Sequence, residues 1–190
     1  MDFQIVNGSI GDSGVTAEVN SNHQLSCKGV GVAAIHEATL KGDAYSWNSV
    51  SADLAAADTA LAVGNESSTR LLVIAGCYIA CDLATQVDFH FPAYPTWAGT
   101  AVTGVNLNRA STKVAPATAY TDETGNTQGA IFLTGYHYIS TVGQESTCPP
   151  VWYSFDDAVI LGEHDIIGVD VVENTAARFE CTLIGYFIDL

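Results

Sequence analysis

Hydrophobic and polar residues alternate with a period of two in several stretches of the chain. Within residues 86–91, Val87, Phe89 and Phe91 occupy one face of an extended segment and polar residues occupy the other. This alternation predicts a β-strand with one buried and one solvent-facing side. Residues 167–171 and 179–183 repeat the pattern, which we interpret as a hairpin or a pair of strands that cross between sheets. Further strands are predicted at residues 3–6, 15–19, 25–35, 44–47, 59–63, 70–79, 129–139 and 151–155.

The number of short strands predicts an all-β fold. Only residues 52–58 have a helix-forming composition, and that segment is too short to be stable as a helix without tertiary support. The 17 glycines separate the strands at the close spacing expected of sandwiches and barrels. Because one flat sheet seldom carries so many strands, we predict a two-sheet antiparallel β-sandwich of the jelly-roll type. We assign residues 44–190 to this domain, and residues 1–43 to N-terminal strands or an arm of the same unit.

Residues 92–128 interrupt the regular spacing of strands. They contain three prolines, many Thr, Ala and Asn residues, and one clear strand candidate at residues 102–107. Long loops in compact domains are usually functional or bound to another part of the structure. We therefore expect a long irregular insertion that is ordered and makes contacts, with a flexible insertion as the alternative.

The charge of the chain excludes several classes of partner. Six basic residues against 21 acidic ones give a net charge of −15 at pH 7, and only 14% of residues are charged. With 48% of the chain apolar, intrinsic disorder is excluded. So few Lys and Arg residues cannot neutralise several phosphates, so we expect neither nucleic acid nor an anionic membrane as a partner. The first residues carry an acidic side chain where a signal peptide has basic ones, and we expect no secretion signal.

The five cysteines show no motif for metal or redox chemistry. They are widely spaced, and no C-x-x-C pair is present. Cys77 and Cys81 fall in one predicted strand and would lie about 13 Å apart at ~3.3 Å per residue, which is too far for a disulfide. We interpret most of these residues as buried thiols of a protein that folds in a reducing compartment.

Residues 11–14 spell Gly-Asp-Ser-Gly, the centre of the chymotrypsin-like serine protease signature. In that family the catalytic His and Asp precede the Ser, whereas the first histidine of this chain is His23. Val15 also replaces the third glycine of the signature. We therefore interpret residues 11–14 as a turn between strands.

The sequence gives little support for a metal site or for a pair of acid-base groups. His90, His137 and His164 could converge on a cupin-type metal site, but no H-x-H pair is present. Residues 122–123 and 156–157 are adjacent carboxylates without the alternating spacing of a calcium loop. Glycoside hydrolysis needs two facing carboxylates, and the sequence selects no such pair. We expect no catalytic residue, no metal ligand and no cofactor.

Protein contacts are the more promising chemistry. Tyr94, Trp97 and Tyr120 lie in the insertion, where they could stack on a sugar, anchor a protein contact or pack against their own domain. Arg109 is one of few cations in an acidic chain and could meet a carboxylate of another subunit. The candidate contact residues are Phe3, Ile5, Tyr94, Trp97, Asn106, Asn108, Arg109 and Tyr120.

Several stretches resemble small jelly-roll structural proteins of tailed bacteriophages, of the capsid decoration (cement) type. These stretches are residues 44–47, 61–67, 70–74, 99–111, 123–129 and 173–190. The resemblance implies a non-enzymatic protein, made in the host cytoplasm, that binds the outer capsid surface of a virion. It also implies a homotrimer whose partner is the major capsid protein of the same virus. Residues 1–20 or the insertion would carry the capsid contacts.

Two alternatives remain open from the sequence. The chain could be the receptor- or glycan-binding head of a tail fibre, with Tyr94, Trp97 or Tyr120 in an exposed aromatic cluster. It could also be a metal-dependent jelly-roll enzyme, for which a bound transition metal would be the evidence. A glycan array and a metal analysis distinguish these two alternatives from the decoration protein.

Overall fold

The computed structural model describes residues 16–19, 25–28, 33–51, 59–81, 84–94, 96–137, 150–172 and 179–190. The chain divides into two compact units, Met1–Ala34 and Ile35–Leu190. In the first unit, β1 (Thr16–Val19) and β2 (Leu25–Lys28) form an antiparallel pair. The prediction that residues 1–43 belong to the same unit as the sandwich stays a prediction. The second unit contains one helix, α1 (Ala34–Lys41, which starts at the unit boundary), and the remaining strands.

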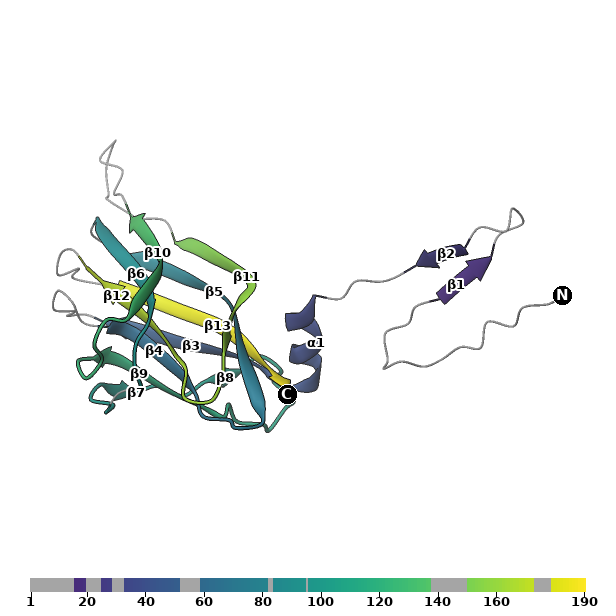
Figure 1. Cartoon of the computed structure of the whole chain (residues 1–190), viewed down its shortest axis with the longest axis horizontal. Coiled ribbons are helices and arrows are strands. Elements are labelled where there is room, and N and C mark those ends of the chain that lie inside the picture. The colour runs from purple at the N-terminus through teal and green to yellow at the C-terminus, as the bar shows by residue number, and fades with distance from the viewer. Residues whose placement is uncertain are drawn as a thin grey trace. The chain divides into compact units, whose positions relative to one another are not determined.

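Two antiparallel sheets pack against each other in the second unit (Figure 1), which confirms the predicted sandwich. One sheet has the strand order β11-β5-β13-β3-β8, and the other has the order β10-β6-β12-β4-β9-β7. The strands are β3 (Ala44–Ser51), β4 (Thr59–Asn65), β5 (Arg70–Cys81), β6 (Thr85–Phe91), β7 (Thr100–Ala101), β8 (Val105–Asn106), β9 (Ala117–Glu123), β10 (Ala130–His137), β11 (Val151–Leu161), β12 (Ile166–Val171) and β13 (Phe179–Asp189).

The pairing of the long strands has the nested order of a jelly roll. β3 pairs with β13, β4 with β12, β5 with β11, and β6 with β10. The eight strands therefore form one long hairpin, with β3 to β6 in one arm and β10 to β13 in the other, and this hairpin is wrapped into the two sheets. The connection between the two arms lies between β6 and β10. Residues 92–128 occupy this connection, so the predicted insertion interrupts the fold where its two halves meet.

The core lies between the inner faces of the two sheets. Its largest fully buried side chains include Trp47, Tyr45, Phe89 and Phe179, which come from both sheets. In β12 and β13 the predicted alternation holds, because Val169 and Leu183 point into the core. Burial of these apolar surfaces supplies the main stabilisation of the sandwich.

The insertion adds strands to the edges of both sheets on one side of the sandwich. β9 pairs with β4, β7 pairs with β9, and β8 pairs with β3. The sequence predicted a single strand at residues 102–107 and missed β9. The segment of β9, ATAYTDE, mixes polar and small residues and lacks a clean alternation. Its strand conformation follows from pairing with the buried strand β4.

Helix α1 corrects the prediction of a strand that extends to residue 35. Its sequence, AIHEATLK, contains good helix formers and an ion pair between Lys41 and Glu37 at 2.7 Å. Gly42 ends the helix with φ +74°, a conformation that glycine adopts at little cost, and its N–H donates to Thr39 O. Ala38 packs with residues on the outer face of the five-stranded sheet, namely Ala44, Val73 and Tyr186.

The polar face of β6 is the second correction. Alternation predicted that this face meets solvent, but Asp88 and His90 are both buried. The end of the insertion and the residue after it contact these side chains, because Gln128 Nε2 lies 3.5 Å from Asp88 Oδ2 and Gly129 N donates to His90 Nδ1 at 3.1 Å. A strand period in the sequence distinguishes two faces of a sheet, but it does not reveal that a distant loop covers one of them.

Candidate interaction site

The insertion forms an aromatic cluster outside the six-stranded sheet. Trp97 stacks on Tyr120 with ring centroids 4.9 Å apart and an interplanar angle of 13°. Tyr94 meets Trp97 edge-on at 6.1 Å, and its hydroxyl donates to Glu66 at 3.0 Å. Gly64 leaves room for the Trp97 ring, since a Cβ there would lie 3.3 Å from it. The structure thus brings the three predicted aromatic residues together, with Tyr94 the most exposed.

The Tyr94 ring also contacts His164, which lies in the turn before β12. Their ring centroids are 4.8 Å apart, and His164 Nδ1 lies 3.6 Å from Glu66 Oε2. Burial, followed by the Glu66 carboxylate, raises the pKa of Tyr94 above its usual value. The cluster therefore joins the start of the insertion to two turns of the sandwich, a role that the sequence did not reveal for Glu66 and His164.

Glu123, at the end of β9, fastens two parts of the insertion together. Its buried carboxylate accepts hydrogen bonds from the N–H groups of Ala98, Gly99 and Gly125, at 2.6 to 3.0 Å. In an irregular segment, a carboxylate can accept the hydrogen bonds of backbone N–H groups that a neighbouring strand would otherwise accept. The residue therefore holds the insertion in place, whereas the sequence offered it as a weak calcium candidate.

Asn106 and Asn108 hold the insertion against helix α1. Asn106 Nδ2 donates to Gly42 O at 2.9 Å, and its Oδ1 accepts from Asn108 N at 2.9 Å. Asn108 Nδ2 donates to Leu40 O at 3.1 Å, so it satisfies a carbonyl in the last turn of the helix. Arg109 follows in the sequence and is exposed. Both asparagines thus make contacts within the chain, and the contact of Arg109 with another subunit stays a prediction.

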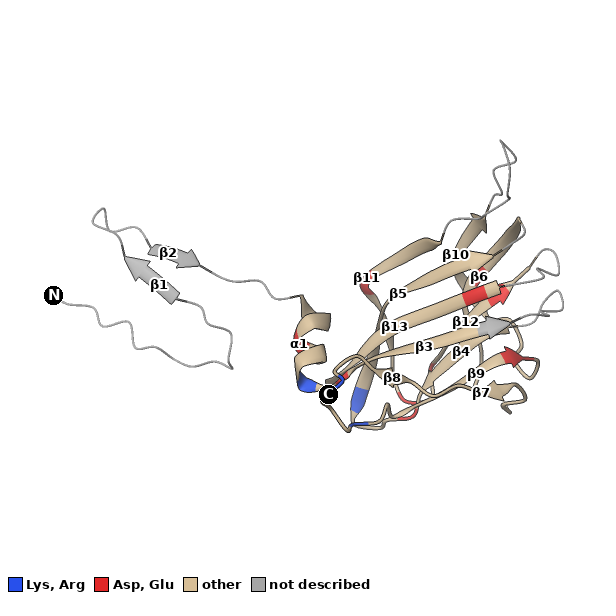
Figure 2. Cartoon of the chain, turned by 180° about the vertical axis from the view of Figure 1, so that it is seen from behind, with Lys and Arg blue, Asp and Glu red and all other residues tan. Residues whose placement is uncertain are grey.

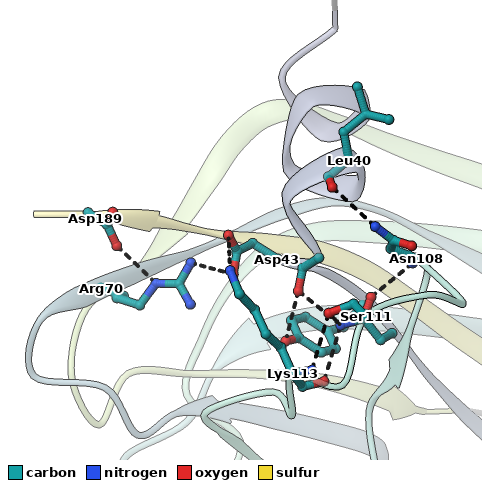
Figure 3. Close-up of polar contacts among 10 residues, drawn as sticks. Leu40, Asp43, Arg70, Asn108, Ser111, Lys113 and Asp189 are labelled. Carbon is teal, nitrogen blue, oxygen red and sulfur yellow. Dashed lines mark hydrogen bonds and ion pairs between the residues drawn. The ribbon is translucent and has the colours of Figure 1, made fainter. Parts of the chain in front are cut away.

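An ion cluster lies beside these asparagines, and Figure 3 shows its contacts. Asp43 is nearly buried and contacts Arg70 at 2.9 Å and Lys113 at 3.0 Å. Arg70 also contacts Asp189 at 3.1 Å and lies over the Phe187 ring at 5.3 Å. Burial would raise the pKa of Asp43, but hydrogen bonds from Lys113 and Arg70 outweigh burial and lower it. This cluster ties the start of β5 and the end of β13 to the insertion.

The described cations of the sandwich gather at this end of it. Figure 2 shows their blue segments near α1 and the C-terminus, away from most red segments. Lys41, Arg70, Arg109 and Lys113 are the Lys and Arg residues within the described part of the second unit. Glu37, Asp43 and Asp189 pair with three of them, so the end with α1 is close to neutral in a chain of net charge −15.

A buried polar row crosses the outer face of the six-stranded sheet. Asp88 and Asp170 lie directly opposite each other on β6 and β12. Thr134 donates to Asp88 at 2.6 Å, and Thr59 donates to Asp170 at 2.7 Å. His90 Nε2 lies 2.9 Å from Asp170 Oδ1, although that approach lacks good hydrogen-bond geometry. These donors stabilise buried carboxylates that no Lys or Arg of the described part contacts.

The three histidines weighed as metal ligands occupy different surroundings. His90 is buried beside Asp170, His137 is buried beside the Tyr153 hydroxyl at 3.0 Å, and His164 is exposed beside Tyr94. Burial lowers the pKa of His137. Within the residues that the structure describes, no group of three or more His, Cys, Asp or Glu side chains could hold a metal ion.

The other acidic pair, Asp156 and Asp157, lies in a register break of β11. Both residues have positive φ values, 48° and 59°. Burial, followed by the charge of Asp157 and a hydrogen bond to it, raises the pKa of Tyr186 to about 12.

In the core, Cys77 Sγ lies 3.4 Å from Cys181 Sγ, and burial raises the pKa of the Cys77 thiol well above its usual value.

Of the predicted contact residues, Phe3 and Ile5 lie outside the described residues. Tyr94, Trp97 and Tyr120 form one cluster, while Asn106, Asn108 and Arg109 lie at the α1 end.

No family model matches the chain, and comparisons with curated proteins and with solved structures also find no match. No helix among the described residues is long and apolar enough to cross a membrane.

Proposed function

We propose that this chain is a non-enzymatic structural protein of a tailed-bacteriophage virion, which binds the outside of the capsid and stabilises it. The presence of two compact units, Met1–Ala34 and a second unit that forms the jelly roll, carries this proposal. A clamp needs a stable body and a second element that contacts a neighbour, and several such contacts on one shell add their binding energies. The resemblance of residues 44–190 to decoration proteins supports the same function.

The chemistry of the described polar residues supports a structural function. Glu123, Asp88 and Asp170 are buried carboxylates, and each accepts hydrogen bonds from the protein itself. They hold the insertion and the sheet together. The net charge of −15 favours solubility and opposes non-specific aggregation before assembly.

The first test is the copy number of this chain relative to the major capsid protein in purified particles. A ratio that approaches one supports decoration of the whole shell. A few copies per particle would place the protein in the tail, and absence from the particle would overturn the proposal. Capsid binding by a chain that lacks residues 1–20 tests the N-terminal contact, with the melting temperature as the control for the fold. Unchanged binding would assign the contact to another surface.

One observation favours a second function, the receptor- or glycan-binding head. Tyr94 is exposed beside the carboxylate of Glu66 and the ring of His164, and an aromatic face with polar groups at its edge suits a sugar. The Trp97 and Tyr120 rings stack on each other, which leaves less ring surface for a ligand. A glycan array with the Tyr94→Ala variant as control tests this function.

A further inference from the structure

The four edges of the two sheets differ in how well they are protected against another strand. β7 and β8, at one side, have two residues each. β11 carries Asp156 and Asp157 in a register break. Short edges, charges and irregular register all hinder pairing with another chain. Among the described strands, these three edges are therefore protected.

β10 is the fourth edge, and it is long and uncharged. Its eight residues, AIFLTGYH, include no Asp, Glu, Lys or Arg, and it ends the six-stranded sheet. One register shift separates Ile131 from Leu133, and the strand is regular from Leu133 to His137. An edge strand of this kind presents backbone N–H and C=O groups to another strand.

Apolar side chains surround the start of β10. Phe91, Ile131, Phe132 and Ile160, which we call the β10 patch, are between 37% and 52% exposed. Phe91 and Phe132 are stacked with ring centroids 4.5 Å apart. Phe91 and Ile160 also line a pocket of about 260 Å³ with Pro92, Leu161, Asp165 and Ile166. Exposed apolar surface beside a strand that ends the sheet in the described part of the chain is typical of an interaction site.

The charge of the chain indicates which partner fits this edge. Two copies that each carry −15 repel each other least where the contact surface has no charge. Neither β10 nor the β10 patch contains a charged residue, and Asp88, opposite Thr134, is buried and hydrogen-bonded. Asp165 is the one charged residue among those that line the pocket.

We propose that β10 pairs antiparallel with β10 of a second copy of this chain. All strand pairs in both sheets are antiparallel, and a two-fold axis at an edge sets a strand antiparallel to its own copy. The six-stranded sheet then continues across the dimer, and the two β10 patches lie along the same seam. This inference does not rest on the proposed capsid function, and the dimer differs from the trimer that the resemblance implies.

Molar mass in solution tests the pairing, with the full chain at about 100 µM, well above a micromolar dissociation constant. One chain has a mass of 20.0 kDa, so the dimer has 2 × 20.0 = 40.0 kDa. Ile131→Lys sets two like charges close to the seam, and we expect dimerisation to weaken at least about tenfold. Val114→Lys is the matched control, because Val114 is 75% exposed in the insertion and the change of charge is identical.

A monomeric wild-type chain, or a trimer that Ile131→Lys leaves intact, would overturn the pairing without affecting the capsid proposal. Amide hydrogen exchange gives a second measurement that needs no variant. If the pairing is correct, the β10 amides exchange more slowly in concentrated than in dilute protein, while amides of β7 and β8 do not change. Equal exchange of the β10 amides at both concentrations would contradict the pairing even if Ile131→Lys fails to fold.

Discussion

The two sides of the sandwich end their sheets in different ways. On the insertion side, β7, β8 and β9 extend the sheets beyond β3 and β4, and polar contacts from Glu123, Asn106 and Asp43 hold the segment. On the β10 side, the sheets end at β10 and β11 with exposed apolar residues beside them. The comparison teaches that the insertion extends and covers one side of the sandwich, whereas the other side ends at β10, an uncharged edge strand that we propose pairs with a second copy.

Because of this difference, we expect substitutions on the insertion side to change the stability of the fold, and substitutions on the β10 side to change association with another molecule. Glu123 and Asp43 on the insertion side are buried, so the loss of either carboxylate leaves its donors without an acceptor and destabilises the fold. Side chains of the β10 patch are partly exposed, so a polar substitution there acts mainly on contacts with another molecule. Substitutions on the two sides therefore have different expected effects on the free energy of unfolding.

The largest expected effect on the insertion side is that of Glu123→Ala. The substitution removes the acceptor for three backbone N–H groups, and it destabilises the protein by about 3 kcal/mol, because hydrogen bonds to a charged group are worth about 1.5 to 3 kcal/mol. Urea unfolding measures this change. Asp122→Asn is the control, because Asp122 is exposed and Asn also tolerates its positive φ of 54°. Equal stability of the two variants would show that the insertion is not held by Glu123.

A smaller effect, dependent on pH, is expected for Asp43→Asn. At pH 7 the substitution removes the charge that Arg70 and Lys113 contact and costs about 2 kcal/mol. Because the pKa of Asp43 is lowered in the folded state, its contribution is present above the unfolded value of about 3.9 and is lost as pH falls through the folded value. The difference in melting temperature between wild type and variant should therefore shrink below pH about 4.

Glu37→Gln is the control for Asp43→Asn, since the Glu37–Lys41 pair is exposed and its loss should leave stability nearly unchanged at every pH. A difference between wild type and Asp43→Asn that is the same at pH 3 and pH 7 would show that the charge of Asp43 is not what stabilises this end.

The next comparison separates two residues that the sequence proposed as equivalent contacts. Asn106→Ala removes the hydrogen bonds that Asn106 donates to Gly42 O and Lys113 O and the one that it accepts from Asn108 N, and it should cost about 1 to 2 kcal/mol in urea unfolding. Arg109→Ala alters an exposed side chain and should change stability by less than about 0.5 kcal/mol. If Arg109→Ala destabilises the protein as much as Asn106→Ala, Arg109 also makes contacts that stabilise the fold, and the distinction between the two residues is wrong.

Much of the sandwich was predictable from local patterns. β4, β5, β6, β12 and β13 have apolar runs or alternation, and the long strands of both sheets coincide with predicted ones. The two local errors also have local reasons. β9 was missed because its sequence lacks alternation, and its strand conformation comes from pairing with β4 and β7. α1 is short enough that its helix depends on Ala38 packing against the sheet.

The site was harder to predict, because its residues are distant in sequence. Tyr94, Trp97 and Tyr120 were found as aromatics in an irregular segment, but Glu66 and His164 come from turns with no motif. Asp43, Arg70 and Lys113 meet only in the fold, and the scarcity of cations drew attention to Arg109 instead. No sequence pattern marks β10 as an edge, since edge position depends on the order of strands in space.

The last prediction concerns the β11 edge, where the register break turns Asp157 toward Tyr186. The pKa of Tyr186 is raised to about 12, whereas an unfolded tyrosine has a pKa of about 10. The free energy of unfolding therefore falls as pH rises above about 10, by at most about 1.4 kcal/mol per pH unit, until the pH reaches the pKa of Tyr186 in the folded protein. Tyr186→Phe removes this group, so its free energy of unfolding should fall less steeply between pH 10 and 11. Identical slopes for the two proteins would show that neither burial nor the Asp157 carboxylate, which belongs to β11 and acts across β5, raises the pKa of Tyr186 on β13.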